Sequence, residues 1–322
     1  MAGRDTKHGE ITLNSTLRAE IDLPCPATGA AYRELAERWF TAAIEALAGP
    51  LGATFAPDAD FSGRAVALSR GEAAPGELWA TLVLLEPTRR RKRPYEVHWS
   101  PKNWRAFLRD LEDMPGQATV ALSTVGPDGH PDQPSLYVDV DRDRDTPEVV
   151  SLVASRSTEE FTDPGTRDET QHRWIAFFRT QLHRHTDILY GSIADDAESV
   201  TGRTALEREI GLLLEDTFPE LDTALRGYAW WTVCSPGAAA RLGGIEALRD
   251  SGAFHEAELL PGGGASLRAT ANLWEYDEER VRAVFRAVAP ALPEGKPSRS
   301  ISSDTHRLVY EDAADHRGAQ RR

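Results

Sequence analysis

Apolar and polar residues follow two different periods along the chain, which predicts a mixture of strands and helices. Residues 16–23 alternate between apolar and polar side chains, as in a strand that buries one face. In the segment 31–49, Leu35 and Trp39 begin an apolar stripe at helical spacing. The segment 228–234 is almost continuously apolar and predicts a buried strand. Strands and helices of these kinds recur throughout, so the sequence predicts an α+β protein.

Two stretches of the chain, Tyr95–Ser123 and Tyr228–Leu260, resemble each other in their sequence of elements. Each contains a Ser-Pro pair that predicts a helix start, and the two serines, Ser100 and Ser235, are 135 residues apart. Five correspondences of this kind follow one another in the same order along the two halves. The sequence therefore favours an internal duplication.

Each half can be written as strand, helix, strand, strand, helix, strand, which is the order of a ferredoxin-like split βαβ unit. The predicted fold is two tandem ferredoxin-like units with antiparallel sheets and helices on one face. The first repeat is placed at residues 15–165 and the second at 166–312, between mobile tails at 1–14 and 313–322. Whether the two repeats share a continuous sheet or meet back to back stays open.

The charge balance restricts the partners that the chain can bind. Of its 322 residues, 51 are acidic and 37 are Lys or Arg, which gives a net charge of −14. This balance argues against nucleic-acid binding, because the phosphate backbone must be neutralised by cations. It suits solubility or a basic protein partner. The one basic run, Arg89–Arg93, fits a hairpin loop better than a docking patch for an acidic partner.

Other bulk features predict a cytoplasmic protein with no membrane contact. No charged and then apolar segment at the start resembles a signal peptide, and no apolar run has the length of a membrane span. The two cysteines, Cys25 and Cys234, are too few for a disulfide framework and too far apart for a zinc clip.

A search for catalytic and ligand-binding motifs finds no signature of an enzyme. His183 and His185 are two residues apart at the end of a predicted helix, so their side chains point to different faces. The acids of residues 139–145 resemble a calcium loop, but Arg144 and Val150 stand where glycine and glutamate are needed. The sequence predicts no cofactor and no metal.

Tryptophans and acids of the second half give the candidate protein-binding residues. Trp230 and Trp231 are adjacent in a predicted strand, so they point to opposite faces. If helices cover only one face, one of these indoles lies on an open face, and aromatic residues are common anchors of protein interfaces. The candidates are Trp230, Trp231, Glu256, Glu258 and Trp274.

The string Gly227-Tyr-Ala-Trp-Trp-Thr-Val233, followed by Ala240-Arg-Leu-Gly-Gly-Ile-Glu-Ala-Leu248, resembles the type VI immunity-like family of bacterial proteins. In that family a strand with tryptophan precedes a helix that ends in Leu-Gly-Gly, and the resemblance covers roughly residues 170–295. It implies a cytoplasmic factor that neutralises a secreted antibacterial toxin, without catalytic residues. The chain departs from the family in its N-terminal copy and in the run Arg89–Arg93.

The resulting hypothesis is a non-enzymatic protein of the immunity type that neutralises a basic protein toxin by binding it. Its oligomeric state stays open, with a homodimer among the alternatives. Two other functions remain. One is an enzyme on a ferredoxin-like scaffold with His98 or His255 as base, and the other is a regulatory module that binds a small ligand between the halves.

Overall fold

The structure is a computed structural model that describes residues 16–49, 51, 52, 55, 58–132, 135–157, 165–195, 202–298 and 307–317. Within these ranges the chain forms a single ten-stranded sheet in which every neighbouring pair of strands is antiparallel. The strand order is β3-β2-β4-β5-β6-β1-β7-β8-β10-β9. Its strands are β1 (Thr16–Pro24), β2 (Leu78–Leu84), β3 (Tyr95–His98), β4 (Gln117–Thr124), β5 (Leu136–Asp141), β6 (Val149–Ser157), β7 (Tyr190–Ala194), β8 (Trp231–Cys234), β9 (Glu256–Leu259) and β10 (Ala265–Arg268).

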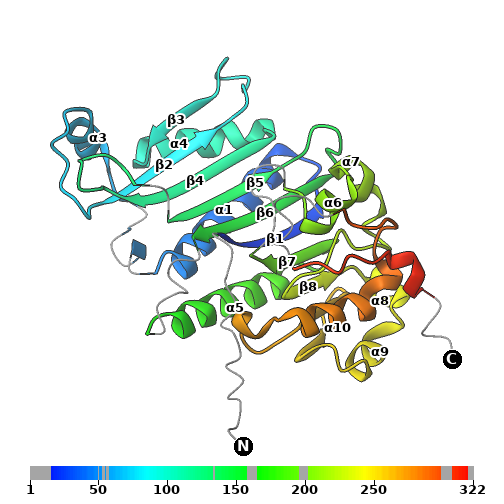
Figure 1. The fold of residues 1–322 in the computed structure, drawn as a ribbon. Helices are drawn as coiled ribbons and strands as arrows, with labels where there is room; N and C mark the ends of the chain where they lie inside the picture. Colours follow the sequence, from blue (N-terminus) through cyan, green and yellow to red (C-terminus); the bar gives the residue numbers. More distant parts are fainter. Residues whose placement is uncertain are drawn as a thin grey trace, which may run out of the picture.

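Helices pack on both faces of this sheet, and the longest two, α1 and α5, lie against its middle (Figure 1). The α-helices are α1 (Gly29–Leu47), α3 (Ser62–Ser69), α4 (Pro101–Asp110), α5 (Arg167–Arg184), α6 (Ala205–Ile210), α7 (Leu214–Thr217), α8 (Pro236–Arg241), α9 (Gly244–Asp250) and α10 (Glu278–Val288). Short 3₁₀ helices follow or extend several of them: Leu111–Asp113, Phe218–Glu220, Leu273–Glu275, Ala289–Ala291 and Ala313–His316.

Strand β1 joins the two halves of the sheet, because it pairs with β6 on one side and with β7 on the other. Its apolar residues, from Leu17 to Leu23, alternate with Arg18, Glu20 and Asp22. Side chains of a strand alternate between the two faces of the sheet, so β1 divides the sheet into an apolar and a charged side. We call these the α1 face and the polar face.

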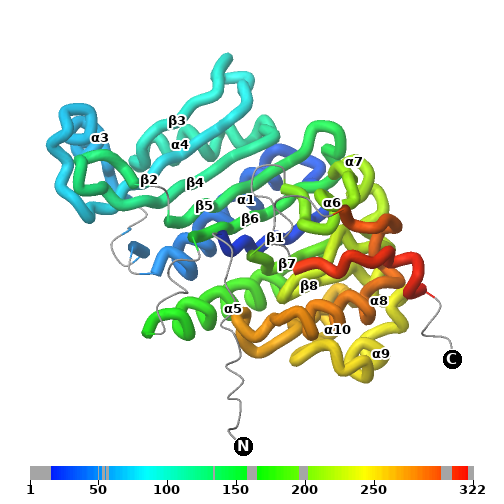
Figure 2. The backbone as a smooth tube through the Cα atoms, in the orientation of Figure 1, coloured from blue at the N-terminus to red at the C-terminus, as the bar shows by residue number. Residues whose placement is uncertain are grey.

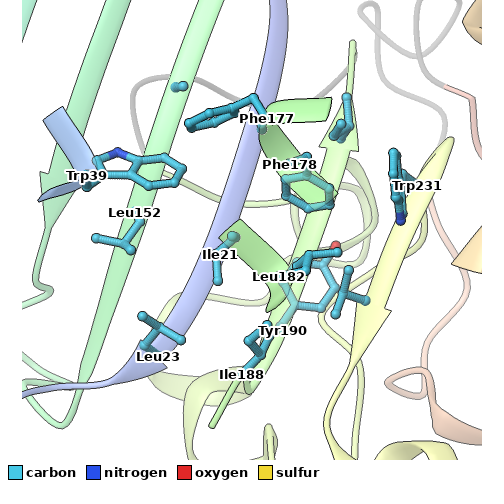
Figure 3. Close-up of a cluster of buried hydrophobic side chains, with 14 of the residues drawn as sticks. Ile21, Leu23, Trp39, Leu152, Phe177, Phe178, Leu182, Ile188, Tyr190 and Trp231 are labelled. Carbon is cyan, nitrogen blue, oxygen red and sulfur yellow. The ribbon is translucent and has the colours of Figure 1, made fainter. Parts of the chain in front are cut away.

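The main core lies on the α1 face, where α1 and α5 pack together over the central strands (Figure 3). The rings of Trp39 on α1 and Phe177 on α5 have centroids 5.1 Å apart. The next residue of α5, Phe178, contacts the ring of Trp231 on β8 at 5.2 Å. Because aromatic pairs of this kind bury large apolar areas, α5 fixes the second half of the sheet to the first.

The α+β class predicted from the sequence is correct, but the two ferredoxin-like units are not present. The sheet is continuous along its whole width, and Figure 2 shows the path of its labelled strands from β3 to β8. Six strands, β1–β6, belong to the first half and four, β7–β10, to the second, and their spatial orders do not repeat. The motifs that suggested a duplication mark local helix starts and stops, and such signals carry no information on strand pairing.

The prediction of helices on one face is also wrong. In Figure 1, α1 and α4 lie behind the sheet, whereas α6, α7 and α10 lie in front of it. All four residues of β8 are at most 1% exposed, although they point alternately to both faces. Both faces of β8 are buried, so both need a covering layer, and α5 covers only one of them.

Several local predictions are confirmed. The side chains of Ser100 and Ser235 accept hydrogen bonds from the third residue of α4 and α8, so each serine is an N-cap. Gly243 and Gly244 separate α8 from α9 with φ of 90° and 82°, a conformation that disfavours residues with a Cβ. The run Arg89–Arg93 lies in the loop between the paired strands β2 and β3, as the hairpin interpretation required.

Other expectations concern the ends of the chain. The tail predicted at residues 1–14 lies outside the described residues, and so do residues 318–322 of the C-terminal one. Residues 313–316 form a 3₁₀ helix in which Ala313 is buried. Among the residues that the structure describes, no helix combines the length and apolar character needed to cross a membrane.

Candidate functional site

The polar face of β1 carries a buried network of charges centred on Arg226. This side chain is 0% exposed, and its Nη1 donates to Glu20 Oε1 and to Asp22 Oδ2, both at 2.7 Å. Its Nε and Nη2 donate to the two carboxylate oxygens of Glu207 on α6, at 3.0 and 3.1 Å. These bonds fasten the segment 202–230 to the middle of the sheet.

Aromatic rings and a capping box complete the surroundings of Arg226. Its guanidinium lies 4.8 Å from the ring of Phe218 and 5.6 Å from that of Tyr190, which favours a cation. Glu207 also accepts from the backbone nitrogen of Thr204, where the two residues form a capping box at the start of α6. The network therefore both orders α6 and holds it against β1.

Strand β5 adds two further acids, Asp139 and Asp141, on the same side of the sheet as Glu20. Burial raises the pKa of Asp139 to about 6, although Thr119 donates a 2.5 Å hydrogen bond to its Oδ1. Burial and then the neighbouring charge of Asp139 raise the pKa of Asp141 well above its ordinary value. The Oδ1 atom of Asp141 is buried and accepts no hydrogen bond.

The network holds more acids than bases. Burial raises the pKa of Asp22 to about 7, and the nearby Glu20 adds to this effect, whereas Arg226 opposes it. Five carboxyl groups face two guanidinium groups in this region: Glu20, Asp22, Asp139, Asp141 and Glu207 against Arg18 and Arg226. The raised pKa values of Asp22, Asp139 and Asp141 favour the neutral forms of these carboxyl groups, and a cation brought to the polar face would favour their ionised forms.

A cleft of about 310 Å³ lies beside this network, lined by the sheet and by the segment 202–230. Arg18, Glu20 and Ser151 form its floor, together with Asp141 from the end of β5. Its rim comes from the chain after β2, the start of β4, the loop after β5 and the segment 202–230. The rim residues are Leu85, Glu86, Gly116, Gln117, Arg142, Asp143, Arg144, Gly202, Leu214 and Phe218.

Cations on the cleft wall already have partners within the protein. Arg18 Nε lies 3.1 Å from Glu20 Oε2, and Arg144 Nε lies 2.5 Å from Glu86 Oε1. Arg142 donates to the carbonyl oxygens of Met114 and Pro147. Asp141 has no such partner, so the arrangement suits a basic side chain that enters the cleft from outside.

Two large side chains are exposed on the same face of the sheet as the cleft. Leu85 on its rim is 51% exposed, and Tyr137 of β5 is 37% exposed. In Figure 1, β2 and β4 have no described helix in front of them. Exposed aromatic and aliphatic groups next to unpaired charge are typical of a surface that binds another protein.

The two tryptophans predicted as binding residues are buried. Trp230 and Trp231 are each 1% exposed, because helices cover both faces of the second half. The indole nitrogen of Trp231 donates to Ser266 Oγ at 2.8 Å, and that of Trp230 donates to Thr270 Oγ1 at 3.0 Å. Both side chains belong to the core in this structure and present no ring to a partner.

The three other predicted residues lie near the surface of the second half. Glu256 on β9 receives hydrogen bonds from Arg179 and Arg268, and Glu258 lies 3.3 Å from His183. Both acids therefore have cationic or potentially cationic neighbours from α5 and β10. Half-buried Trp274 lies elsewhere, beneath the guanidinium of Arg167 at 4.6 Å. The structure does not bring these residues to the cleft.

The histidines considered as bases lie far apart in the strand order, His98 in edge strand β3 and His255 just before the opposite edge strand, β9. His98 Nε2 is 3.1 Å from Ser62 Oγ, which gives a serine–histidine contact. Asp60 accepts from the backbone of Ser62, so it lies beside the serine and does not orient the imidazole as a triad acid does.

Residues 139–145, which resemble a calcium loop, contribute to the cleft in another way. Asp139 and Asp141 lie in β5, and Asp143 caps the turn that follows by accepting from the backbone nitrogens of Asp145 and Thr146. Among the described residues, no group of three or more His, Cys, Asp or Glu side chains is arranged to hold a metal ion.

Sequence reasoning missed Arg226 and the charged side of β1. The signal was present in residues 16–23, where three charged residues alternate with apolar ones. Alternation of this kind usually marks a solvated face. Here the strand lies in the centre of the sheet, and a segment about 200 residues away covers the charges. Only the tertiary pairing could identify them as buried.

Comparisons with known proteins support the fold. No protein-family model matches the sequence, and no curated protein matches it. Among solved structures, the chain is similar to the Pseudomonas aeruginosa T6SS protein PA0821, with a TM-score of 0.52 and 17% sequence identity. The similarity covers 94% of this chain and 82% of that chain. At this level of identity it concerns the arrangement of the elements alone.

Proposed function

We propose that this chain is a non-enzymatic binding protein of the immunity type, which neutralises a basic protein toxin by holding it on the polar face. The observation that carries the proposal is the cleft beside β1, where acids outnumber bases and Asp141 Oδ1 accepts no hydrogen bond. A lysine or arginine of the toxin would supply the missing charge. The exposed Leu85 and Tyr137 would add apolar contact around it.

The charge of the whole chain supports the same partner. With a net charge of −14, the protein attracts a basic toxin over a long range before contact, which raises the rate of association. The similarity of fold to a T6SS protein agrees with a role connected to type VI secretion. A binding factor of this kind needs no catalytic group, so the proposal requires none of the histidines.

The test begins with the full chain expressed beside its neighbouring genes. We expect a tagged copy to co-purify with one neighbour whose own expression stops bacterial growth, and we expect co-expression of the chain to restore growth. Recovery of the chain without any neighbour, or growth arrest that the chain does not relieve, would contradict the proposal.

Substitutions at two leucines with almost equal exposure test where the partner makes contact. Leu85 on the cleft rim is 51% exposed, and Leu259 on edge strand β9 is 55% exposed. On the polar face, Leu85→Arg adds a bulky cation that repels a basic partner, and it should weaken binding by about tenfold or more. Leu259→Arg should leave binding unchanged. The reverse result would place the contact at the β9 edge of the sheet, away from the cleft.

A further inference from the structure

A basic region stands out within this acidic chain. Residues 89–113 contain eight Lys and Arg and four Asp and Glu, a balance of +4, whereas the whole chain has a net charge of −14. They form the β2–β3 hairpin loop, β3, α4 and the 3₁₀ helix after it. In Figure 1, α4 lies behind the sheet, on the α1 face and thus opposite the cleft.

Part of this positive charge is used within the protein. Arg89 and Arg91 pair with Asp113 and Asp110, at 3.4 and 3.3 Å. Arg90 lies 3.8 Å from Glu112 and donates to the carbonyl oxygen of Arg109. These contacts tie the hairpin loop to the end of α4, which gives this part of the basic run a structural role.

Three cations on α4 have no such role. Lys102, Arg105 and Arg109 are exposed, and none of them forms an ion pair with any residue that the structure describes. Their spacing of three and four residues places them along one side of the helix. A row of unpaired cations of this kind costs electrostatic energy in the isolated protein, and an anionic partner would relieve it.

The same three side chains line a groove between α4 and α1. The groove encloses about 430 Å³, and Arg33 and Glu37 of α1 form its other wall. Leu108 lies in its lining between the cations and is itself 9% exposed. Beneath it, the rings of Phe40 and Phe107 pack 5.7 Å apart and hold the two helices together. The groove therefore has a firm floor with Leu108 as the apolar side chain of its lining, and its border is basic apart from Glu37.

We propose that this groove between α1 and α4 binds an acidic segment of a partner protein, with carboxylates on Lys102, Arg105 and Arg109 and an apolar side chain over Leu108. The proposal goes beyond the proposed function, because the groove lies on the opposite side of the sheet from the cleft and attracts the opposite charge. A single chain would then contact a basic partner on one side and an acidic one on the other.

An acidic protein segment fits the groove better than the other polyanions do. A nucleic acid would bring its phosphates close to an otherwise strongly acidic chain, which repels them. A phosphate backbone also has no apolar group to place over Leu108. A short stretch of protein with alternating acidic and apolar residues satisfies both the row of cations and the channel.

The experiment uses the full chain and a fluorescent peptide of three Glu-Glu-Leu-Glu repeats, measured by anisotropy at low ionic strength. The matched peptide of Gln-Gln-Leu-Gln repeats has the same apolar residues without the charge. We expect the acidic peptide to bind and the glutamine peptide not to bind. Arg105→Glu should weaken binding by about tenfold or more. Arg286→Glu, which reverses an exposed cation on α10, should leave it unchanged.

Three outcomes would overturn the proposal. The first is equal binding of the glutamine peptide, and the second is equal weakening by Arg286→Glu, which would make the effect one of total charge. The third is tighter binding of a DNA duplex or of a second copy of the chain at the groove, shown by competition and sedimentation and lost in Arg105→Glu. None of these measurements involves the toxin, so they remain decisive if the proposed function fails.

Discussion

The two halves of the sheet differ in how many of their faces are buried. In β8 every side chain is at most 1% exposed, since α5 covers one face and a second layer of chain covers the other. In β2 and β5 the α1 face is buried, while the polar face retains partly exposed groups such as Trp79 and Tyr137. One continuous sheet therefore combines a sealed half with a half that keeps one face accessible to partners.

The boundary between the two halves of the sheet lies at β1. At this boundary buried charged side chains, instead of apolar ones, hold the segment 202–230 against the sheet. The segment 202–230 covers the sheet through Arg226, which bonds to Glu20 and Asp22 of β1. A charged closure of this kind gives no large gain in stability but depends on every member being present, because a buried charge without a partner is costly.

The largest effect is expected from Arg226→Met, which removes the cation and keeps much of the side-chain volume. Three buried carboxyl groups, those of Glu20, Asp22 and Glu207, would lose their shared partner. We expect the free energy of unfolding to fall by about 3–5 kcal/mol. Urea denaturation at neutral pH measures this change.

Arg286→Met provides the control, because Arg286 is exposed on α10. Its effect should stay within about 0.5 kcal/mol. If Arg226→Met costs no more than this control, the charges do not hold the segment 202–230 in place. Protease digestion then distinguishes local release of the segment from global unfolding, since early cleavage within residues 202–230 would indicate release alone.

Local structure was largely predictable from the sequence, and strand pairing was not. The helix at 29–47 and its stop, the Ser-Pro caps of α4 and α8, and the hairpin around Arg89–Arg93 all follow from patterns within a few residues. The neighbours of β1 are β6 and β7, each more than 100 residues away. Repeated caps and glycines describe how a segment begins and ends, but they do not specify its partners in the sheet.

The second-largest effect is expected from pH, which changes the contribution of Asp139 to stability in the half of the sheet with the accessible face. Burial raises the pKa of Asp139 from an ordinary 3.8 to about 6, so the folded protein binds this proton more tightly than the unfolded chain does. Its contribution to stability is fully present below about pH 4 and is lost as the pH rises through about 6. Asp139→Asn removes the titration and keeps an oxygen that can accept from Thr119.

We therefore expect the wild-type protein to lose about 1–3 kcal/mol more than Asp139→Asn between about pH 4 and about pH 8. Urea denaturation across this range gives the two curves. Asp250→Asn, on an exposed acid at the end of α9, should run parallel to the wild type. Parallel curves for Asp139→Asn and the wild type would show that this carboxyl is not perturbed.

The candidate site was only partly visible in the sequence for the same reason. The acidic composition indicated a basic partner, and composition needs no knowledge of the fold. The individual residues did depend on the fold. Trp230 and Trp231 were chosen on the assumption of one open face, and a second covering layer buries both. Asp141 and Leu85 come together at the cleft only through the pairing of β2, β4 and β5.

The smallest effect is expected when one tryptophan in each half of the sheet is replaced by phenylalanine. Trp231→Phe leaves a space under Phe178 and removes the donor to Ser266, so the free energy of unfolding should fall by about 1–3 kcal/mol. Trp79→Phe makes the same change on the polar face of β2, where the half-buried ring has the rings of Phe61 and His98 at 6.2 Å. Its cost should be below about 1 kcal/mol, because a partly solvated site leaves no dry cavity. Equal losses would mean that the polar face of β2 is as tightly sealed as β8, and the accessible half would then be too closed to receive a partner.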